Sequence, residues 1–573
     1  MNGKTQRPHG KILKSEIGTI RKTGKERLKI AVVYPNTYHV GMSNLGFQTV
    51  YRLLNALEDV VCERAFLPDR QTPRSGRITT IESQKPLNSY DIVAFSISFE
   101  NDFPHILEIL AQAALPLKAI DRGPPHPLVI AGGVACLLNP EPIAPFIDCF
   151  LIGEAEAMLT AFIETFDPAE NRKTCLKTLA RNIPGVYVPA LYRPAYKKDG
   201  TLSSFKALAD VPERIKRKFL ADLSGVDTCS TILTPDTTFG RTYLIEVSRG
   251  CPHGCRFCSA GYVYRPPRFS PLAQLEKCID NGARLAEKIG LVGAAVSDLP
   301  GLDRLCLKAR QKNLAVSFSS FRADALTPEL VAALERSKVR TAAIAPDAGS
   351  ERMRRVINKG LSEQDILHAA EVLVAGGVPN LKLYFMIGLP TETDDDVQAI
   401  VTLCKKIKHR FLQSSRIRKR IGEITVTLNS FVPKPFTPFQ WTAMSEVTEL
   451  KKKIKRVRNG LRRVANVRLH TDIPRWMALQ GLFSRGDRRV AELLLLAAKN
   501  DGNWAKTLKE TPLNPDFYTC RERPLDERLP WDFIDHGIKK SYLAHEYKSA
   551  LAAKSSSPCR LEPCRDCRIC MEI

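Results

Sequence analysis

Two series of continuous apolar segments, separated by stretches with helical spacing, constrain the fold of this chain most strongly. Strands that are apolar on both faces are typical of parallel sheets, because crossover helices cover both sides of such a sheet. The first series predicts a doubly wound Rossmann-like domain over residues 28–165. Its strands are the apolar segments 28–35, 91–99, 127–135 and 146–154.

The second series begins near residue 242 and contains six apolar segments that alternate with helical patterns. Six parallel strands with crossover helices predict a partial (β/α)6 barrel, in which chemistry is carried by loops at the carboxyl ends of the strands. The six strands are expected at 243–248, 289–298, 314–323, 341–348, 381–390 and 423–431.

These two series also set the expected domain boundaries of an α/β protein. Between them, Lys198-Asp199-Gly200 separates two alternating segments, which is a hairpin turn signal. We expect four regions: a basic tail over 1–27, the Rossmann-like domain with a hairpin linker over 28–225, the barrel over 235–470, and a C-terminal region with a cysteine-rich tail over 471–573.

The composition excludes several classes of protein. The 573-residue chain has no apolar run of the ~18 residues that a membrane-spanning helix needs, so we expect no membrane span. Its basic, polar start lacks the apolar core of a secretory signal, which indicates a cytoplasmic protein. In that reducing compartment, clustered cysteines are better explained as metal ligands than as disulfides. The scattered ones are expected to be buried: Cys62, Cys136, Cys149, Cys175, Cys229, Cys278, Cys306 and Cys404.

The most specific motif follows the first strand of the expected barrel. Three cysteines have CxxxCxxC spacing there: Cys251, Cys255 and Cys258. Three thiolates from one loop can ligate three irons of a 4Fe–4S cube, which leaves the fourth iron open. Gly250 and Gly254 allow a tight backbone around such a cluster. The alternative is structural zinc, but zinc usually takes four ligands in paired spacing, and His253 lies too close between the cysteines for an easy tetrahedral site.

This loop resembles the signature of the radical S-adenosylmethionine (SAM) superfamily, in which an aromatic residue, here Phe257, precedes the last cysteine. Three later segments resemble the fourth, fifth and sixth strand regions of members such as methylthiotransferases and Elongator-type enzymes, in the expected order: 344–360, 381–397 and 426–441. Many members have Gly-Gly-Glu at the end of the second strand to hold the methionine amino group. This chain lacks that triplet, and its candidate substitutes are Gly293, Ser297 and Asp298.

The resemblance implies a cofactor chemistry. In the superfamily the open iron binds SAM, and one electron cleaves its sulfonium to give a radical that abstracts hydrogen from the substrate. A flavodoxin- or ferredoxin-type protein is the implied electron donor. Carried over residue by residue, the three loop cysteines hold the cluster and six residues are candidates for SAM contacts, each of which also has an ordinary turn or helix-cap explanation: Ser320, Arg322, Asp347, Ser350, Gly388 and Pro390.

The first domain resembles the cobalamin-binding-like domain that is fused to many such enzymes. The matching residues are Gly132, Gly133, Asp148, Gly153, Glu154 and Glu156. Domains that bind cobalamin in the base-off form carry DxHxxG, whereas this chain has His39 and Gly41 without the aspartate or the spacing. The domain therefore either binds cobalamin without that histidine ligand or keeps only the fold, and we favour a degenerate or substrate-contacting role.

The C-terminal tail holds a second cysteine cluster, in Cx4CxxCxxC spacing: Cys559, Cys564, Cys567 and Cys570. Thiolates suit either an auxiliary iron–sulfur cluster or structural zinc, and the ferredoxin-like CxxCxxC favours the cluster. The alternative is a disordered tail with free thiols. Together with the segment 529–543, this tail resembles an uncharacterised radical SAM subfamily, which does not identify a substrate.

The net charge of +24 favours an anionic partner or substrate, such as RNA. The segments 405–420 and 451–468 are dense in Lys and Arg, and they are either solvated helices or a surface that follows phosphates. Our first hypothesis is a radical SAM enzyme that acts on RNA or another large substrate. The alternatives are a cobalamin-dependent radical methylase or cyclase of a small metabolite, and a scaffold without catalysis.

Overall fold

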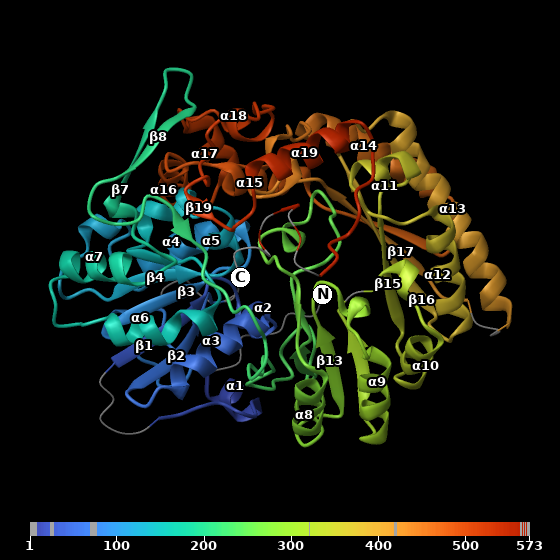
Figure 1. Ribbon diagram of the computed structural model, residues 1–573, viewed down its shortest axis with the longest axis horizontal. Coiled ribbons are helices and arrows are strands. Elements are labelled where there is room, and N and C mark those ends of the chain that lie inside the picture. The colour runs from blue at the N-terminus through green and yellow to red at the C-terminus, as the bar shows by residue number, and fades with distance from the viewer. Residues whose placement is uncertain are drawn as a thin grey trace.

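The computed structural model describes residues 9–22, 28–68, 77–319, 321–417, 421–561, 564, 566–567 and 569. Within these ranges the chain forms two α/β lobes and a helical C-terminal region that spans both of them (Figure 1). The expected α/β class is confirmed. All eight scattered cysteines are buried, as predicted, and the fifteen described cysteines are free thiols.

The N-terminal lobe contains a six-stranded sheet in the order β2-β1-β3-β4-β5-β6. Its first five strands are parallel and the last pair is antiparallel. The four strands expected from the sequence are β1, β3, β4 and β5, and the full set is β1 (Leu28–Tyr34), β2 (Val60–Phe66), β3 (Ile92–Ser96), β4 (Leu128–Gly132), β5 (Cys149–Leu151) and β6 (Val186–Tyr187).

The sequence did not predict β2, because charged residues interrupt its apolar pattern. Arg64 in this strand is nevertheless fully buried, since it pairs with Glu16 at 2.8 Å and with Glu82 at 2.6 Å. These carboxylates come from distant parts of the chain and meet Arg64 only in the folded protein. The strand therefore has a polar sequence pattern although it is buried in the fold.

Helices cover both faces of this sheet, so alternate residues of one strand enter different cores. Ile30 and Val32 pack against one helical layer, whereas Ala31 and Val33 pack against the other. The first layer is α3 (Leu45–Ala56), α6 (Leu159–Thr165) and α7 (Arg172–Asn182), and the second includes α4 (Phe103–Gln112) and α5 (Val134–Leu138). Two short helices, α1 (His9–Ser15) and α2 (Tyr38–Met42), lie near the first layer.

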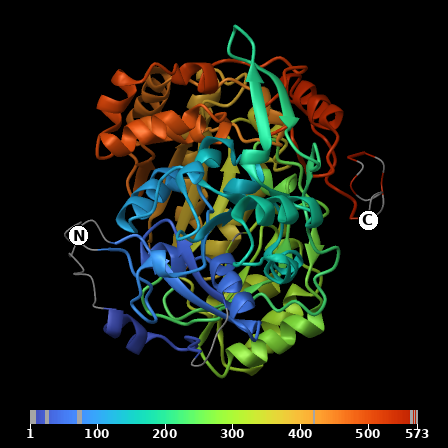
Figure 2. The same cartoon turned by 90° about the vertical axis from the view of Figure 1, so that its left-hand side faces the viewer.

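The expected hairpin linker is confirmed as the antiparallel pair β7 (Tyr192–Tyr196) and β8 (Leu202–Ala207), which projects from the body of the molecule (Figures 1 and 2). Downstream of the hairpin, β9 (Ile215–Lys216) pairs in parallel with β19 (Ile534–Asp535). This pairing ties the linker to the C-terminal region.

The second lobe has the six expected barrel strands and a seventh. These parallel strands form two sheets, of which the first is β10 (Tyr243–Glu246), β13 (Lys288–Val292) and β14 (Ala315–Phe318), and the second is β15 (Thr341–Asp347), β16 (Asn380–Ile387), β17 (Ile424–Ser430) and β18 (Val467–Thr471). In the described ranges β14 and β15 do not pair with each other, so the barrel is open between them. The sequence did not predict β18, a half-exposed edge strand whose pattern is mostly polar.

The outer layer of this lobe consists of α8 (Leu272–Gly282), α9 (Leu302–Gln311), α10 (Pro328–Arg336), α11 (Glu351–Val356), α12 (Glu363–Ala375), α13 (Asp394–Ile417) and α14 (Val447–Leu461). A small ribbon, β11 (Ser248–Arg249) with β12 (Arg268–Phe269), brackets the cysteine loop.

The C-terminal region bridges the lobes from above (Figures 1 and 2). Its helices are α15 (Pro474–Arg485), α16 (Val490–Lys499), α17 (Trp504–Glu510), α18 (Pro515–Thr519) and α19 (Lys540–Leu551). The buried Glu100 of the N-terminal lobe shows the connection, because it accepts hydrogen bonds from Lys434 of the barrel at 2.6 Å and from Gln480 of α15 at 3.1 Å. In the described part of the chain, no helix is both long and apolar enough to cross a membrane.

Candidate active site

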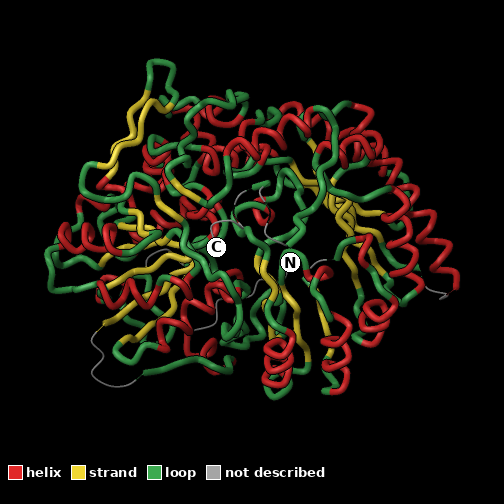
Figure 3. The backbone as a smooth tube through the Cα atoms, viewed as in Figure 1, coloured by secondary structure: helices red, strands yellow, loops and turns green. Residues whose placement is uncertain are grey.

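The cysteine loop leaves the barrel just beyond the carboxyl end of β10, where loops fill the space between the lobes (Figure 3). Gly250 opens the loop with a φ of 80°, and a Cβ atom there would lie 2.6 Å from the carbonyl oxygen of Tyr264. A side chain would therefore separate the two ends of the loop, which explains why glycine stands at this position.

The loop brings its three thiols close enough to influence one another. Burial, together with the neighbouring Cys255 and Cys258, raises the pKa of Cys251 to about 12. Burial also raises the pKa of Cys255 to about 11, and it raises the pKa of Cys258. Three half-buried thiols whose pKa values are raised need nearby cations to become thiolates, and iron ions provide such charges.

No three His, Cys, Asp or Glu side chains of the described residues surround a position for one metal ion. A 4Fe–4S cube does not require that arrangement, because each cysteine binds a different iron. His253, the residue between the first two cysteines, turns away to Asp298, whose Oδ1 lies 2.7 Å from its Nε2.

Two cations of the second half of the barrel lie near the loop. Lys359 and Arg322 both lower the pKa of the Cys255 thiol, although burial outweighs them. Lys359 is held by Asp347 at 2.6 Å, and Arg322 donates two hydrogen bonds to Asp324 at 3.0 and 2.9 Å. The sequence analysis selected Arg322 and Asp347, and it missed Lys359, because only the fold carries this lysine to the loop.

Asp347 ends β15 with a φ of 60°, which is uncommon for a residue other than glycine. The strand register shifts between Ile344 and Asp347, so a bulge re-aims the carboxylate. Strained backbone of this kind is enriched at functional sites.

The other SAM-contact candidates differ in their surroundings. Ser350 caps α11, where its Oγ accepts from the Met353 N–H at 3.1 Å and donates to Asp396 at 2.6 Å, so capping accounts for this hydroxyl. Gly388 has a φ of 79° and donates its N–H to Glu392 at 2.8 Å, two residues before Pro390. Ser320 lies outside the described residues.

Two buried oxygens near the end of β13 have no hydrogen-bond partner in the described structure: Asp298 Oδ2, in the segment after β13, and Ser248 Oγ, on β11 beside Gly293. Asp298 is one of the three candidate substitutes for the missing Gly-Gly-Glu. Its Oδ1 is occupied by His253, and its free Oδ2 is an acceptor without a donor. An ammonium group would satisfy that oxygen.

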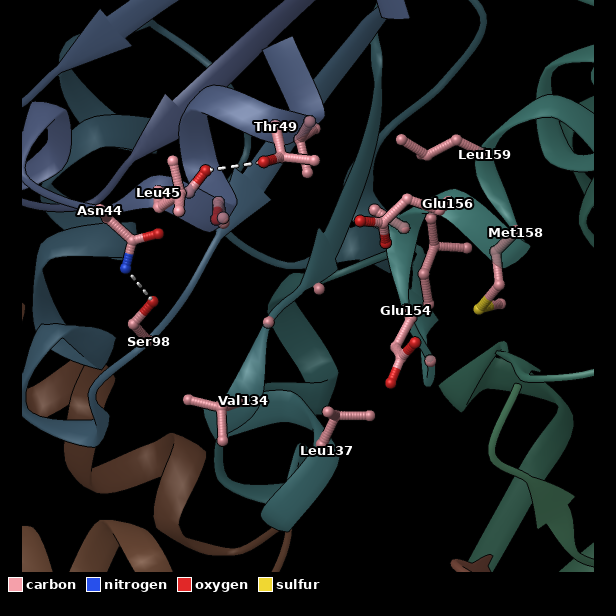
Figure 4. A pocket seen from close by; sticks show the side chains of 18 of the residues that line it. Asn44, Leu45, Thr49, Ser98, Val134, Leu137, Glu154, Glu156, Met158 and Leu159 are labelled. Atoms are coloured by element: carbon pink, nitrogen blue, oxygen red, sulfur yellow. Dashed lines mark hydrogen bonds between the residues drawn. The ribbon is translucent and has the colours of Figure 1, made fainter. Parts of the chain in front are cut away.

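A pocket of about 510 Å³ lies between the N-terminal sheet and the helices α3 and α6, and it opens toward the cysteine loop. Figure 4 shows Val134 and Leu137 on one side, and Glu154 and Glu156 nearer the barrel. Its inner walls are the apolar strand residues Ile30, Val32, Ala94 and Ile130, and its mouth includes Gly250, Val292, Gly293 and Ala294.

None of the described residues that line this pocket is a histidine. His39, the histidine that the sequence analysis considered, is about half exposed and lies 3.1 Å from Asp236. Polar residues also line the pocket, among them Asn44, which donates to Ser98 at 3.0 Å (Figure 4).

A buried ionic cluster closes the boundary between the lobes beside this mouth. Arg249, two residues before Cys251, contacts Glu154 at 3.0 Å, Glu156 at 2.5 Å and Glu246 at 2.9 Å. Burial and the neighbouring carboxylates raise the pKa of Glu246, although Arg249 opposes them. The sequence analysis selected Glu154 and Glu156 but missed Arg249 as their partner, because the contact joins residues far apart in the chain.

The sequence also matches two described families. Residues 46–189 match "Radical SAM proteins, N-terminal", and residues 245–404 match "Radical SAM superfamily". Together the matched segments span more than half of the chain. The protein is therefore an enzyme of the radical SAM superfamily, and this membership implies a 4Fe–4S cluster and SAM as cofactors.

Two relatives place the chain more closely. It is 29% identical over 526 residues to an uncharacterized protein of Methanocaldococcus jannaschii. The aligned residues cover 90% of this chain and 98% of the relative. It is 25% identical over 177 residues to an uncharacterized methyltransferase of Pyrococcus horikoshii, which covers 30% of this chain and 38% of the relative.

The chain is also similar to solved structures that include the radical SAM methyltransferase TsrM from Kitasatospora setae with cobalamin and a 4Fe–4S cluster bound. TsrM is 12% identical to this chain, and the superposition has a TM-score of 0.49. The superposition covers 82% of this chain and 99% of the TsrM chain. The cobalamin-dependent SAM radical enzyme OxsB is 16% identical, covers 66% of this chain and 51% of its own, and has a TM-score of 0.42.

Proposed function

We propose that Cys251, Cys255 and Cys258 hold a 4Fe–4S cluster on which this enzyme cleaves SAM reductively. The observation that carries the proposal is the position of all three half-buried thiols on one short loop just beyond the carboxyl end of β10. When bound, the cluster and SAM supply reductive cleavage of a carbon–sulfur bond and the radical that starts the substrate chemistry.

The chain's own residues orient and neutralise these groups. Lys359 and Arg322 offset the negative charge of a thiolate-ligated cluster beside Cys255. Asp298 presents its free Oδ2 to the methionine amino group, while His253 fixes the carboxylate through Oδ1. Gly388 and Pro390 stay candidates for the adenine side, and Asp347 is positioned by Lys359.

Anaerobic reconstitution of the full chain tests the cluster. We expect wild-type protein to produce 5′-deoxyadenosine from SAM with dithionite, and a variant with Cys251, Cys255 and Cys258 changed to Ala to produce none. Chromatography of the nucleoside products measures this activity. Cys520→Ser, at a half-buried thiol outside the loop, is the control. Product formation by the triple variant would contradict the proposal.

Asp298→Asn separates SAM binding from cluster assembly. A lost hydrogen bond to a charged group costs about 1.5–3 kcal/mol, which corresponds to roughly a tenfold or larger rise in the Kd of SAM. We expect unchanged iron content with weaker SAM binding, measured by equilibrium dialysis on the reconstituted protein. An unchanged Kd would remove Asp298 from this role.

A corrinoid in the 510 Å³ pocket is a second candidate component of the reaction. The pocket supports it because ligands of doubly wound domains bind outside the carboxyl ends of the strands, and this one also extends between the sheet and α3 and α6. With no histidine among the described lining residues, the cobalt would lack an imidazole from that wall. The sequence favoured a degenerate or substrate-contacting domain, whereas the open pocket favours a domain that binds a ligand.

Hydroxocobalamin binding tests this second candidate. We expect the wild type to retain cobalamin through gel filtration, measured by its visible absorption. Ala94→Phe, which fills the inner wall, should lose it, and the cysteine-loop triple variant should keep it. If the wild type retains none, the pocket serves another ligand.

A further inference from the structure

The C-terminal tail does not leave the body of the protein after α19 but crosses the cysteine loop. Ser556 donates its N–H to Asn358 Oδ1 at 2.9 Å, and Cys559 donates its N–H to the carbonyl oxygen of Pro252 at 2.8 Å. Pro252 is the residue after Cys251, so the backbone of the first tail cysteine is docked on the residue next to the first cysteine of the loop.

A buried arginine of the loop holds the base of this tail. Arg256 pairs with Glu546 of α19 at 3.0 Å and donates to the carbonyl oxygen of Lys554 at 2.8 Å. Its side chain is fully buried, so the contact is part of the core rather than a surface association. Asn358 completes the link, because its amide also donates to the Gly254 carbonyl at 3.2 Å.

The part of the tail around Cys567 contacts the other end of the cysteine loop. Cys567 is only 2% exposed, and its side chain lies beside Arg265. Arg265 in turn donates to the Gly261 carbonyl at 2.6 Å and lies over the rings of Tyr262 and Tyr542. The tail cysteines therefore adjoin both ends of the loop that carries Cys251, Cys255 and Cys258.

We propose that Cys559, Cys564 and Cys567 bind a second iron–sulfur cluster, docked against the loop of the first. Thiolates closely spaced in sequence are the ligands of such clusters, and each binds its own iron. Arg256 at the base of the tail and Arg265 beside Cys567 offset the negative charge of thiolates in a buried site. Cys570, the fourth cysteine of the motif, lies outside the described residues.

The placement also assigns a task to this cluster. Ser557, Pro558 and Arg560 are exposed, so a protein donor can reach the tail. One electron passes from a flavodoxin- or ferredoxin-type donor, which is oxidised, to the tail cluster. The tail cluster is then reoxidised as it reduces the loop cluster. This relay rests on the proposed function, but metal binding by the tail does not.

Iron and sulfide analysis with Mössbauer spectroscopy tests the second cluster. We expect about eight irons in the reconstituted wild-type chain and about four in each of two triple variants. One variant changes the loop cysteines to Ala, and the other changes Cys559, Cys564 and Cys567 to Ser. Cys520→Ser should keep the wild-type content. A loop variant without iron, a tail variant with full iron, or zinc bound at the tail when both metals are supplied would each overturn the proposal.

The choice of reductant tests the relay. With dithionite, the tail variant should still form 5′-deoxyadenosine; with reduced flavodoxin, it should lose this activity while the wild type retains it. Equal loss with both reductants would refute the relay. Wild-type protein that is inactive with dithionite would refute the proposed function instead, while the iron content would still decide the second cluster.

Discussion

At the scale of single residues, two kinds of group stand out from ordinary core packing. They are buried polar atoms without a hydrogen-bond partner and buried charges held in ion pairs. His536 is one such group, because its buried Nδ1 has no hydrogen-bond partner in the part of the chain that the structure describes. Its Nε2 lies 2.8 Å from the Leu137 carbonyl, and its ring meets Phe436 edge-on at 4.3 Å. Burial, and next the charge of Arg217, lowers the pKa of His536 to about 3.

His536 should make the protein sensitive to mild acid. The unfolded chain binds a proton near pH 6.5, but the folded chain does so only near pH 3, so its stability falls as the pH falls through this window. The slope from this group is about 1.4 kcal/mol per pH unit. Urea unfolding at pH 7, 6 and 5 should show a shallower pH dependence for His536→Gln than for the wild type. Parallel curves would contradict this expectation.

At the scale of elements, the ribbon β11–β12 connects the cysteine loop to the other lobe. Arg249 on β11 and Arg268 on β12 both contact Glu154 of the N-terminal lobe, at 3.0 and 2.7 Å. Residues of this ionic cluster also line the pocket. The same side chains therefore hold the cysteine loop and would contact a ligand in the pocket.

Breaking this cluster should destabilise the protein strongly. Arg249→Met leaves buried carboxylates without their partner, which costs about 3–5 kcal/mol. Arg304→Met removes the same kind of pair at the surface, where Arg304 is 65% exposed, and should cost no more than about 1 kcal/mol. Denaturant unfolding with iron analysis measures both effects. Equal costs for the two variants would show that the buried cluster has no special role.

At the scale of the whole molecule, the net charge is +24, and α14 on the outside of the barrel carries six basic residues against one acidic residue. Lys455 and Arg458 are exposed opposite the buried Ile454 and Val457, and in the part of the chain that the structure describes neither has an acidic partner. Such like charges destabilise a helix slightly, so the structure agrees with a surface that binds an anion, and RNA binding stays a prediction.

Charge reversal on α14 tests this partner. The variant Lys455→Glu/Arg458→Glu should weaken binding of a fluorescent transfer RNA and reduce the salt slope of log K by about 2. Lys173→Glu/Lys177→Glu on α7 changes the net charge equally and should bind like the wild type. Fluorescence anisotropy over a salt series measures both. If the two variants lose the same affinity, only net charge matters and α14 is not the binding surface.

Much of the fold and the reaction class followed from local patterns. Continuous apolar strands predicted both sheets, because burial on two faces leaves no room for polar alternation. The CxxxCxxC loop predicted the cofactor chemistry, because its ligands are only a few residues apart. Both features depend only on residues that are neighbours in the sequence. One is a set of ligands within a single loop, and the other is a strand buried on both faces.

Contacts between distant segments determined the rest. The pairing of Arg64 with Glu16 and Glu82, the approach of Lys359 to Cys255, and the docking of Cys559 on Pro252 all join parts of the chain whose spacing in sequence carries no pattern. A polar residue can be buried in a strand, or can contribute its charge to a site, only when the fold brings its partner close and excludes water. For that reason the motif was evident in the sequence, whereas its charged surroundings, the pocket and the docked tail emerged only from the packed lobes.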